Sequence, residues 1–72
     1  MRFAAARWLP GRAAVDALVA TLKDIDADVR EQAAWALGAI GDARALAGLT
    51  SALKDSASSV RRQAAWALGA IQ

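Results

Sequence analysis

The hydrophobic positions of this chain recur with a fixed spacing. The segment Val29–Ile40 returns almost unchanged as Val60–Ile71, 31 residues later, and 11 of the 12 positions are identical. The one difference is Glu31, which is replaced by Arg62. A period between about 20 and 50 residues is typical of supersecondary units that stack on one another. The pattern therefore predicts a repeat protein.

Each of these segments is preceded by another amphipathic segment. Arg12–Lys23 and Ala43–Lys54 both place apolar residues at i, i+3 and i+7, which predicts two helices with one buried stripe each. Gly11 precedes the first of them in the N-cap position, and Lys23 in its last turn suits the helix dipole. The expected stripes are Val15, Leu18 and Leu22, and then Leu46, Leu49 and Leu53.

The repeated segments themselves predict longer helices with a broad apolar face. Asp26 is expected to cap the first of them, and Gly41 and Asp42 to end it and cap the helix that follows. In the second unit Ala57 replaces the capping aspartate, so we expect Ser56 or Ser58 to cap the last helix. On a helical wheel the expected core face of the first repeated segment is Val29, Ala33, Ala36, Leu37 and Ile40.

The helices are joined by short connections, which predict antiparallel neighbours. A single helix pair cannot bury its own stripe, so we expect an all-α fold, an α-solenoid of two stacked pairs in one domain. The first repeat spans residues 10–40 and the second residues 41–72. Residues 1–9 align with 32–40, which predicts the last turns of a partial helix; a disordered leader is the alternative.

Trp35 and Trp66 are the sharpest functional feature. On the wheel each indole lies about 140° from the centre of its core face, so the two should form an aromatic stripe along one surface. Tryptophan is strongly enriched at binding hot spots. The alternative is that each indole packs over the alanine-rich neighbouring helix. The residues expected to surround the stripe are Glu31, Ala39, Arg62 and Ala70.

Composition excludes several kinds of chemistry. The chain has no cysteine and no histidine, which rules out disulfides, thiol nucleophiles and imidazole catalysis. Its net charge of +2 is weak evidence for a nucleic-acid partner. The carboxylates Asp24, Asp26 and Asp28 lie in a turn that lacks the glycine and terminal glutamate of a calcium loop, which favours solvated caps. Charged residues interrupt every apolar run, so no membrane span is expected and the cytoplasm is the default location.

The spacing of these residues resembles the HEAT repeat, in particular the short HEAT-like repeats named after phycobilisome lyases. The residues that carry this resemblance are Asp24, Val29, Arg30, Ala33, Ala34, Ala36, Leu37, Gly38, Ile40, Gly41, Asp42, Arg44 and Ala45. It implies a right-handed solenoid whose second helices line the concave side. It also implies a structural ladder between units, formed by Asp24 with Arg30 and by Asp55 with Arg61.

These observations predict a non-enzymatic scaffold module, without a cofactor or a metal, that binds another protein on its concave second-helix face. The alternatives are a fragment of a bilin lyase or isomerase, suggested by the resemblance alone, and a DNA-binding protein. Two units with uncovered ends also predict self-association into a homo-oligomer, because stacked repeats generally need at least three units for stability.

Overall fold

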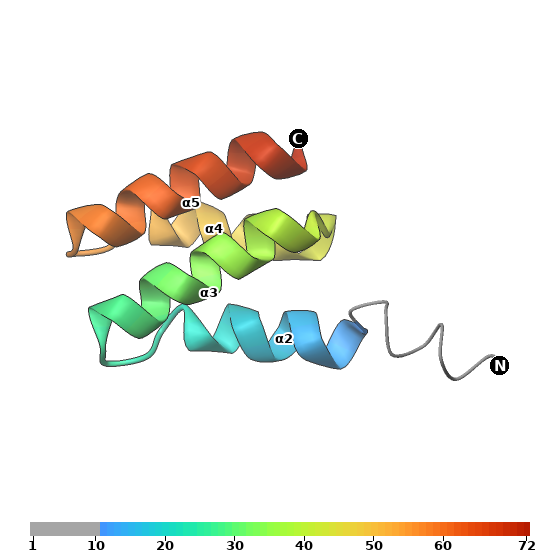
Figure 1. The fold of residues 1–72 in the computed structure, drawn as a ribbon, viewed down its shortest axis with the longest axis horizontal. Coiled ribbons are helices and arrows are strands. Elements are labelled where there is room, and N and C mark those ends of the chain that lie inside the picture. The colour runs from blue at the N-terminus through green and yellow to red at the C-terminus, as the bar shows by residue number, and fades with distance from the viewer. Residues whose placement is uncertain (1–10) are drawn as a thin grey trace, which may run out of the picture.

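The computed structural model describes residues 11–72, and within this range the secondary structure is entirely helical (Figure 1). The partial helix expected at residues 1–9 lies outside the described residues. In chain order the elements are α2 (Arg12–Thr21), α3 (Ala27–Ile40), the 3₁₀ turn η1 (Ala43–Ala45), α4 (Leu46–Ala52) and α5 (Ser58–Ile71).

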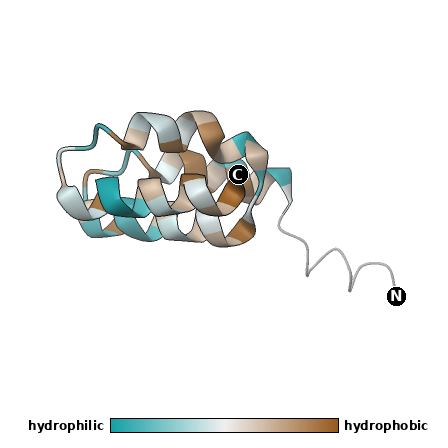
Figure 2. Cartoon of the chain, turned by 90° about the horizontal axis from the view of Figure 1, so that it is seen from above, coloured by the Kyte–Doolittle hydropathy of each residue, from teal (hydrophilic) through white to brown (hydrophobic). Residues whose placement is uncertain are grey.

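The helices form two antiparallel pairs, and each pair contributes one helix to each of two layers. The first helices, α2 and α4, lie in one layer, and the second helices, α3 and α5, run parallel in the other (Figures 1 and 2). The contacts between α3 and α5 join the two units, while α2 packs on α3 and α4 packs on α5 within them. Over the described residues the chain is thus a two-unit fragment of an α-solenoid, as the repeat predicted.

The ends of α3 follow from local chemistry. Asp26 is the N-cap residue, and its Oδ1 accepts a hydrogen bond of 2.8 Å from the backbone N–H of Asp28. At the other end Gly41 adopts a left-handed conformation with φ of 78° and donates its N–H to the carbonyl of Leu37 at 3.1 Å. Asp42 then accepts the N–H of Arg44 at 2.8 Å and caps η1. All three predicted roles are confirmed.

The prediction that Ser56 or Ser58 caps the last helix is wrong. Ala57 occupies the N-cap position of α5 without a side-chain hydrogen bond, and the helix still begins at Ser58, in register with Ala27 of the first unit. The turn before it is held instead by Asp55, whose Oδ1 accepts the N–H of Ala57 at 2.9 Å. The missing cap therefore does not shift the helix, because an aspartate two residues earlier already sets the turn.

Both first helices are shorter than predicted. The helix α2 ends at Thr21, and the N–H of Lys23 bonds to the carbonyl of Ala20, three residues back, so Lys23 lies beyond the last turn. In the second unit, residues 43–45 form the 3₁₀ turn, and α4 ends at Ala52 rather than Lys54. Tighter i→i+3 bonds commonly close helix ends in this way.

The core lies between the two layers, and its membership differs from the helical-wheel prediction. Val29 and Leu53 were expected inside but are 38% and 39% exposed, while Ala34 and Gly38 are buried. Gly38 lies beneath α5, since a Cβ atom on it would meet Trp66 and Ala67 of that helix. The fully or nearly fully buried apolar residues are Val15, Leu22, Ala33, Ala34, Leu37, Ala45, Leu49, Ala52, Val60, Ala64 and Ala67.

Candidate functional site

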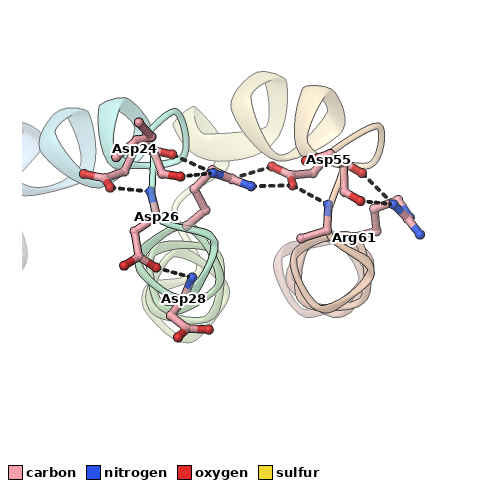
Figure 3. Close-up of polar contacts among 9 residues, drawn as sticks. Asp24, Asp26, Asp28, Asp55 and Arg61 are labelled. Atoms are coloured by element: carbon pink, nitrogen blue, oxygen red, sulfur yellow. Dashed lines mark hydrogen bonds and ion pairs between the residues drawn. The ribbon is translucent and has the colours of Figure 1, made fainter.

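A row of alternating acidic and basic residues runs along the turn end of the molecule (Figure 3). Arg30, in the first turn of α3, donates Nε and Nη2 to the two carboxylate oxygens of Asp55 at 2.9 and 3.1 Å. Its Nη1 donates to the carbonyl oxygens of Asp24 and Ile25 at 2.7 and 3.1 Å. One guanidinium therefore ties the turn of its own unit to the carboxylate of the next unit.

The same arrangement begins again in the second unit. Nη1 of Arg61 donates to the carbonyl oxygens of Asp55 and Ser56 at 2.7 and 3.1 Å, as Arg30 does one unit earlier. The structure thus brings the four predicted ladder residues together. Asp24 contributes to Arg30 through its backbone carbonyl, because its carboxylate accepts the N–H of Asp26 at 2.9 Å. Every one of these contacts is structural and joins protein groups to each other.

The ion pair shifts the titration of its members. The hydrogen bond from Arg30, followed by that from the N–H of Ala57, lowers the pKa of Asp55 below its ordinary value of 3.8. The same hydrogen bond, which Arg30 donates to Asp55, raises the pKa of Arg30. Asp42, which accepts Nε and Nη2 of Arg44, has its pKa lowered to about 2 by that side-chain contact. None of these carboxylates is set up to take a proton near neutral pH.

The predicted aromatic stripe lies on the outer surface of the second-helix layer, which we call the second-helix face and define as the exposed side of α3 and α5. Trp35 is 51% exposed and Trp66 is 47% exposed. Arg62, Ala39 and Ala70 are also exposed, and Glu31 is half-buried. Indoles that are this open to solvent are uncommon, since aromatic side chains are normally among the most buried in a small domain.

Two adjoining open hollows lie beside these indoles. One, of about 250 Å³, is lined by Glu31, Gln32, Trp35 and Gln63. The other, of about 400 Å³, is lined by Trp35, Arg62, Gln63 and Trp66. Because both hollows share Trp35 and Gln63, they adjoin, and we call the two together the indole groove. Glu31 lines one part of it and Arg62 the other.

Trp66 also has a packing role. A Cβ atom placed on Gly38 would lie 2.5 Å from Cζ3 of Trp66, so the edge of this indole rests on the glycine of α3. The sequence left two uses open for these tryptophans, a binding surface and packing against the neighbouring helix. For Trp66 the structure shows both exposure and packing, and the two are compatible because only one edge of the ring is covered.

A third hollow was not predicted. It measures about 570 Å³ and lies where α2 and α4 meet, with Val19 and Leu22 opposite Gly48 and the Arg30–Asp55 pair at its rim. The signal for it in the sequence is Gly48, which takes the place of a side chain where Val19 approaches: a Cβ there would be 3.0 Å from Cγ1 of Val19. The two opposite charges of the rim pair are already satisfied by each other, so they present little net charge to a ligand.

Other kinds of site find no support in the described part of the chain. Among residues 11–72 there is no group of three or more histidine, cysteine, aspartate or glutamate side chains that could hold a metal ion. The Oδ1 atoms of Asp24 and Asp26 accept backbone N–H groups within the turn. No helix in this range is both long enough and apolar enough to cross a membrane.

The family model described as HEAT repeats matches residues 1–71, nearly the whole chain. The finer resemblance to the repeats of phycobilisome lyases has no support in this match. No curated protein matches the chain.

Proposed function

Because this chain belongs to the HEAT repeat family, we propose that it is a non-enzymatic module that binds another polypeptide in the indole groove of its second-helix face. HEAT repeats generally mediate protein–protein interaction. The observation that supports this particular face is the pair of half-exposed indoles, Trp35 and Trp66, which are one repeat apart and line adjoining hollows.

The exposed indole area is large enough to drive binding. About half of each ring remains open to solvent, so a partner could cover roughly 100 Å² of each tryptophan, worth about 2–3 kcal/mol per indole before the costs of association. Gln63 lines both hollows. Its amide can donate to and accept from a polypeptide backbone. The groove therefore suits a short peptide segment with an apolar side chain at its centre.

The charges of the groove suggest the direction in which such a segment lies. Glu31 and Arg62 occupy equivalent positions in the two units, and they form the single difference between the repeated segments. Neither forms an ion pair with another described residue. A partner with a basic side chain near Glu31 and an acidic one near Arg62 would complement both, and charge complementarity mainly governs specificity and register.

The alternative functions have less to support them. A bilin lyase or isomerase was suggested by the resemblance to one group of repeats, and no described feature is specific to a pigment. DNA binding would need a positively charged face, whereas the indole groove is lined by both Arg62 and Glu31. The proposal therefore remains a protein-binding one, without catalysis.

Selection from a random peptide library displayed on phage, followed by measurement of the dissociation constant for each selected peptide, tests this proposal. We expect peptides that bind the wild-type chain to lose roughly 10-fold or more in affinity on Trp35→Ala, since tenfold corresponds to about 1.4 kcal/mol. Trp35 is the better choice than Trp66, because Trp66 also packs on Gly38. Lys54→Ala, at an exposed position in the second turn, is the matched control and should bind like the wild type.

Circular dichroism of the same variants separates binding from folding. Trp35→Ala should keep the helical spectrum at room temperature, because half of the ring is already in water. If that variant unfolds, Trp35 is a packing residue. If the library yields no peptide whose binding depends on Trp35, the groove is not the binding surface.

A further inference from the structure

Two equivalent glycines have opposite surroundings. Gly38 of α3 lies directly beneath α5, and a Cβ there would be 2.8 Å from Cα of Ala67. Gly69 is its equivalent in α5, 31 residues later, and a Cβ there would meet no atom within 4 Å. Its neighbour Ala65 is likewise exposed, whereas the equivalent Ala34 is fully buried. The groove that receives α5 in the first unit is thus present, with the same residues, but uncovered in the second.

The ladder of Asp24, Arg30, Asp55 and Arg61 also has an unfilled position at each end of the described range. Arg61 holds the carbonyls of its own turn through Nη1, as Arg30 does. However, Nε and Nη2 of Arg30 bind the carboxylate of Asp55, and among the described residues the corresponding atoms of Arg61 bind no carboxylate. At the other end of the stack, Asp24 is the equivalent of Asp55 and has no arginine on its carboxylate in the described range.

The opposite end of the stack offers the complementary surface. Val29 of α3 is 38% exposed, although its equivalent Val60 is fully buried against the first unit. Ala36 is similarly more open than its equivalent Ala67. These residues of α3 correspond to the ones that α5 uses to pack on α3. The two ends therefore match each other in shape and in charge.

We propose that the chain self-associates head to tail. In this contact α3 of one copy packs on α5 of another copy, with the same geometry as the contact between α3 and α5 within one chain. The occupant of the flank formed by Ala65 and Gly69 is a second copy. In that contact Arg61 binds the carboxylate of Asp24 in the neighbouring copy, and the neighbouring Val29 becomes buried. Because the two surfaces differ, the contact is heterologous and leaves a free end on every assembly.

This arrangement uses an interface that the chain already contains. Both partners of the new contact have nearly the sequence of the α3–α5 contact, because α3 and α5 differ at three of their 14 positions: Ala27 and Ser58, Asp28 and Ser59, and Glu31 and Arg62. Glu31 lies two helical turns before Gly38 on the same side of α3, and Arg62 lies likewise before Gly69 in α5, so the new contact has Arg62 where the internal contact has Glu31. The proposal does not depend on peptide binding in the indole groove, and either can fail without the other.

Sedimentation equilibrium of the wild-type chain from about 1 µM to about 1 mM covers the range of weak and moderate dissociation constants. We expect the average mass to rise with concentration and to pass beyond that of a dimer, as a heterologous contact requires. A chain that remains strictly monomeric, or that stops at a closed dimer, would overturn the proposal.

Gly69→Leu tests the contact itself. Since nothing lies near Gly69, the leucine leaves the fold of the monomer intact, yet it fills the space that the neighbouring α3 needs. The dissociation constant should rise by more than about tenfold, the size expected for overpacking a close helix contact. Ala70→Leu is the matched control: its equivalent Ala39 stays exposed even though α5 covers α3, so position 70 lies outside the contact and association should not change.

A charge variant adds a second, independent readout. Asp24→Asn keeps an oxygen to accept the N–H of Asp26 but removes the charge that Arg61 of the neighbour would bind, so association should weaken by several fold and lose part of its salt dependence. Association that survives Gly69→Leu and Asp24→Asn, or that is lost with Ala70→Leu, would show that the copies meet through another surface and would contradict the proposal.

Discussion

The helices α3 and α5 are nearly identical in sequence and differ in what surrounds them. Leu37 of α3 is completely buried, whereas the equivalent Leu68 of α5 is partly open to solvent. The reverse holds at the start of the helices, where Val29 is exposed and Val60 is buried. In a stack of repeats, one flank of each second helix packs on the unit before it and the other on the unit after it. The same residue can therefore be core in one unit and surface in the next.

This comparison separates the contribution of a residue from the contribution of its position in the stack. A single chain contains both environments for the same side chain, so equivalent substitutions in the two units form natural pairs. Any difference in the effect of such a pair comes from the neighbouring unit, because local sequence and helix propensity are matched. The largest differences are expected where one member is fully enclosed.

Leu37→Ala and Leu68→Ala should give the largest contrast. Leu37 has no exposed surface, and truncating a fully buried leucine removes apolar contacts and leaves a cavity. We expect the free energy of unfolding to fall by about 3–5 kcal/mol for Leu37→Ala and by less than about 2 kcal/mol for Leu68→Ala. Urea denaturation at a concentration where the chain is monomeric measures both. Equal losses would mean that the two helices are equally enclosed.

Gly38→Ala and Gly69→Ala should differ in sign. At position 69 an alanine meets nothing and gains helix propensity, so stability should rise by about 0.5–1 kcal/mol. At position 38 the same methyl group overlaps with Trp66 and with the backbone of Ala67, which should cost about 1–3 kcal/mol and outweigh that gain. Thermal unfolding of the two variants side by side gives the answer. A stabilising Gly38→Ala would show that α3 and α5 can move apart at little cost.

The smallest expected contrast concerns the ladder and depends on pH. The folded-state pKa of Asp55 is lowered by Arg30, so the stability that this pair contributes is fully present above the unfolded value of 3.8 and is lost as pH falls through the lowered folded-state pKa. Asp42, with its pKa of about 2, adds to the loss in the same acidic window. The chain should therefore become less stable between about pH 4 and about pH 2.

Asp55→Asn and Asp24→Asn separate the contribution of the ion pair. The first removes the carboxylate that Arg30 binds, so the variant should be less stable at neutral pH and its stability should fall less steeply in acid. The second removes an equivalent carboxylate that has no arginine on it in the described range, so it should cost less stability at neutral pH than Asp55→Asn. Urea unfolding of monomeric protein across this pH range is the measurement. If the free energy of unfolding fell with pH in the same way for the wild type and both variants, the Asp55 ion pair would not contribute to the acid dependence.

Much of this molecule could be predicted from its sequence because the relevant interactions are local. A capping aspartate bonds to an N–H two residues away, and a left-handed glycine ends a helix without help from distant residues. Asp26, Gly41 and Asp42 are accordingly in their predicted roles, and the 31-residue repeat of apolar positions predicted the stacked helix pairs. The positions of the two indoles on an open face follow from the same helical periodicity.

The tertiary structure decided which residues of each helix are buried and which contacts join the units. A helical wheel places Val29 and Val60 alike, and nothing within one unit distinguishes Ala34 from Ala65; the neighbouring helix does. The partner of Arg30 is a carboxylate 25 residues away, and the hollow beside Gly48 exists because α2 approaches α4 there. Hydrogen bonds within a turn are set by a few consecutive residues, but burial depends on what lies across the interface, and that is determined by how the units stack.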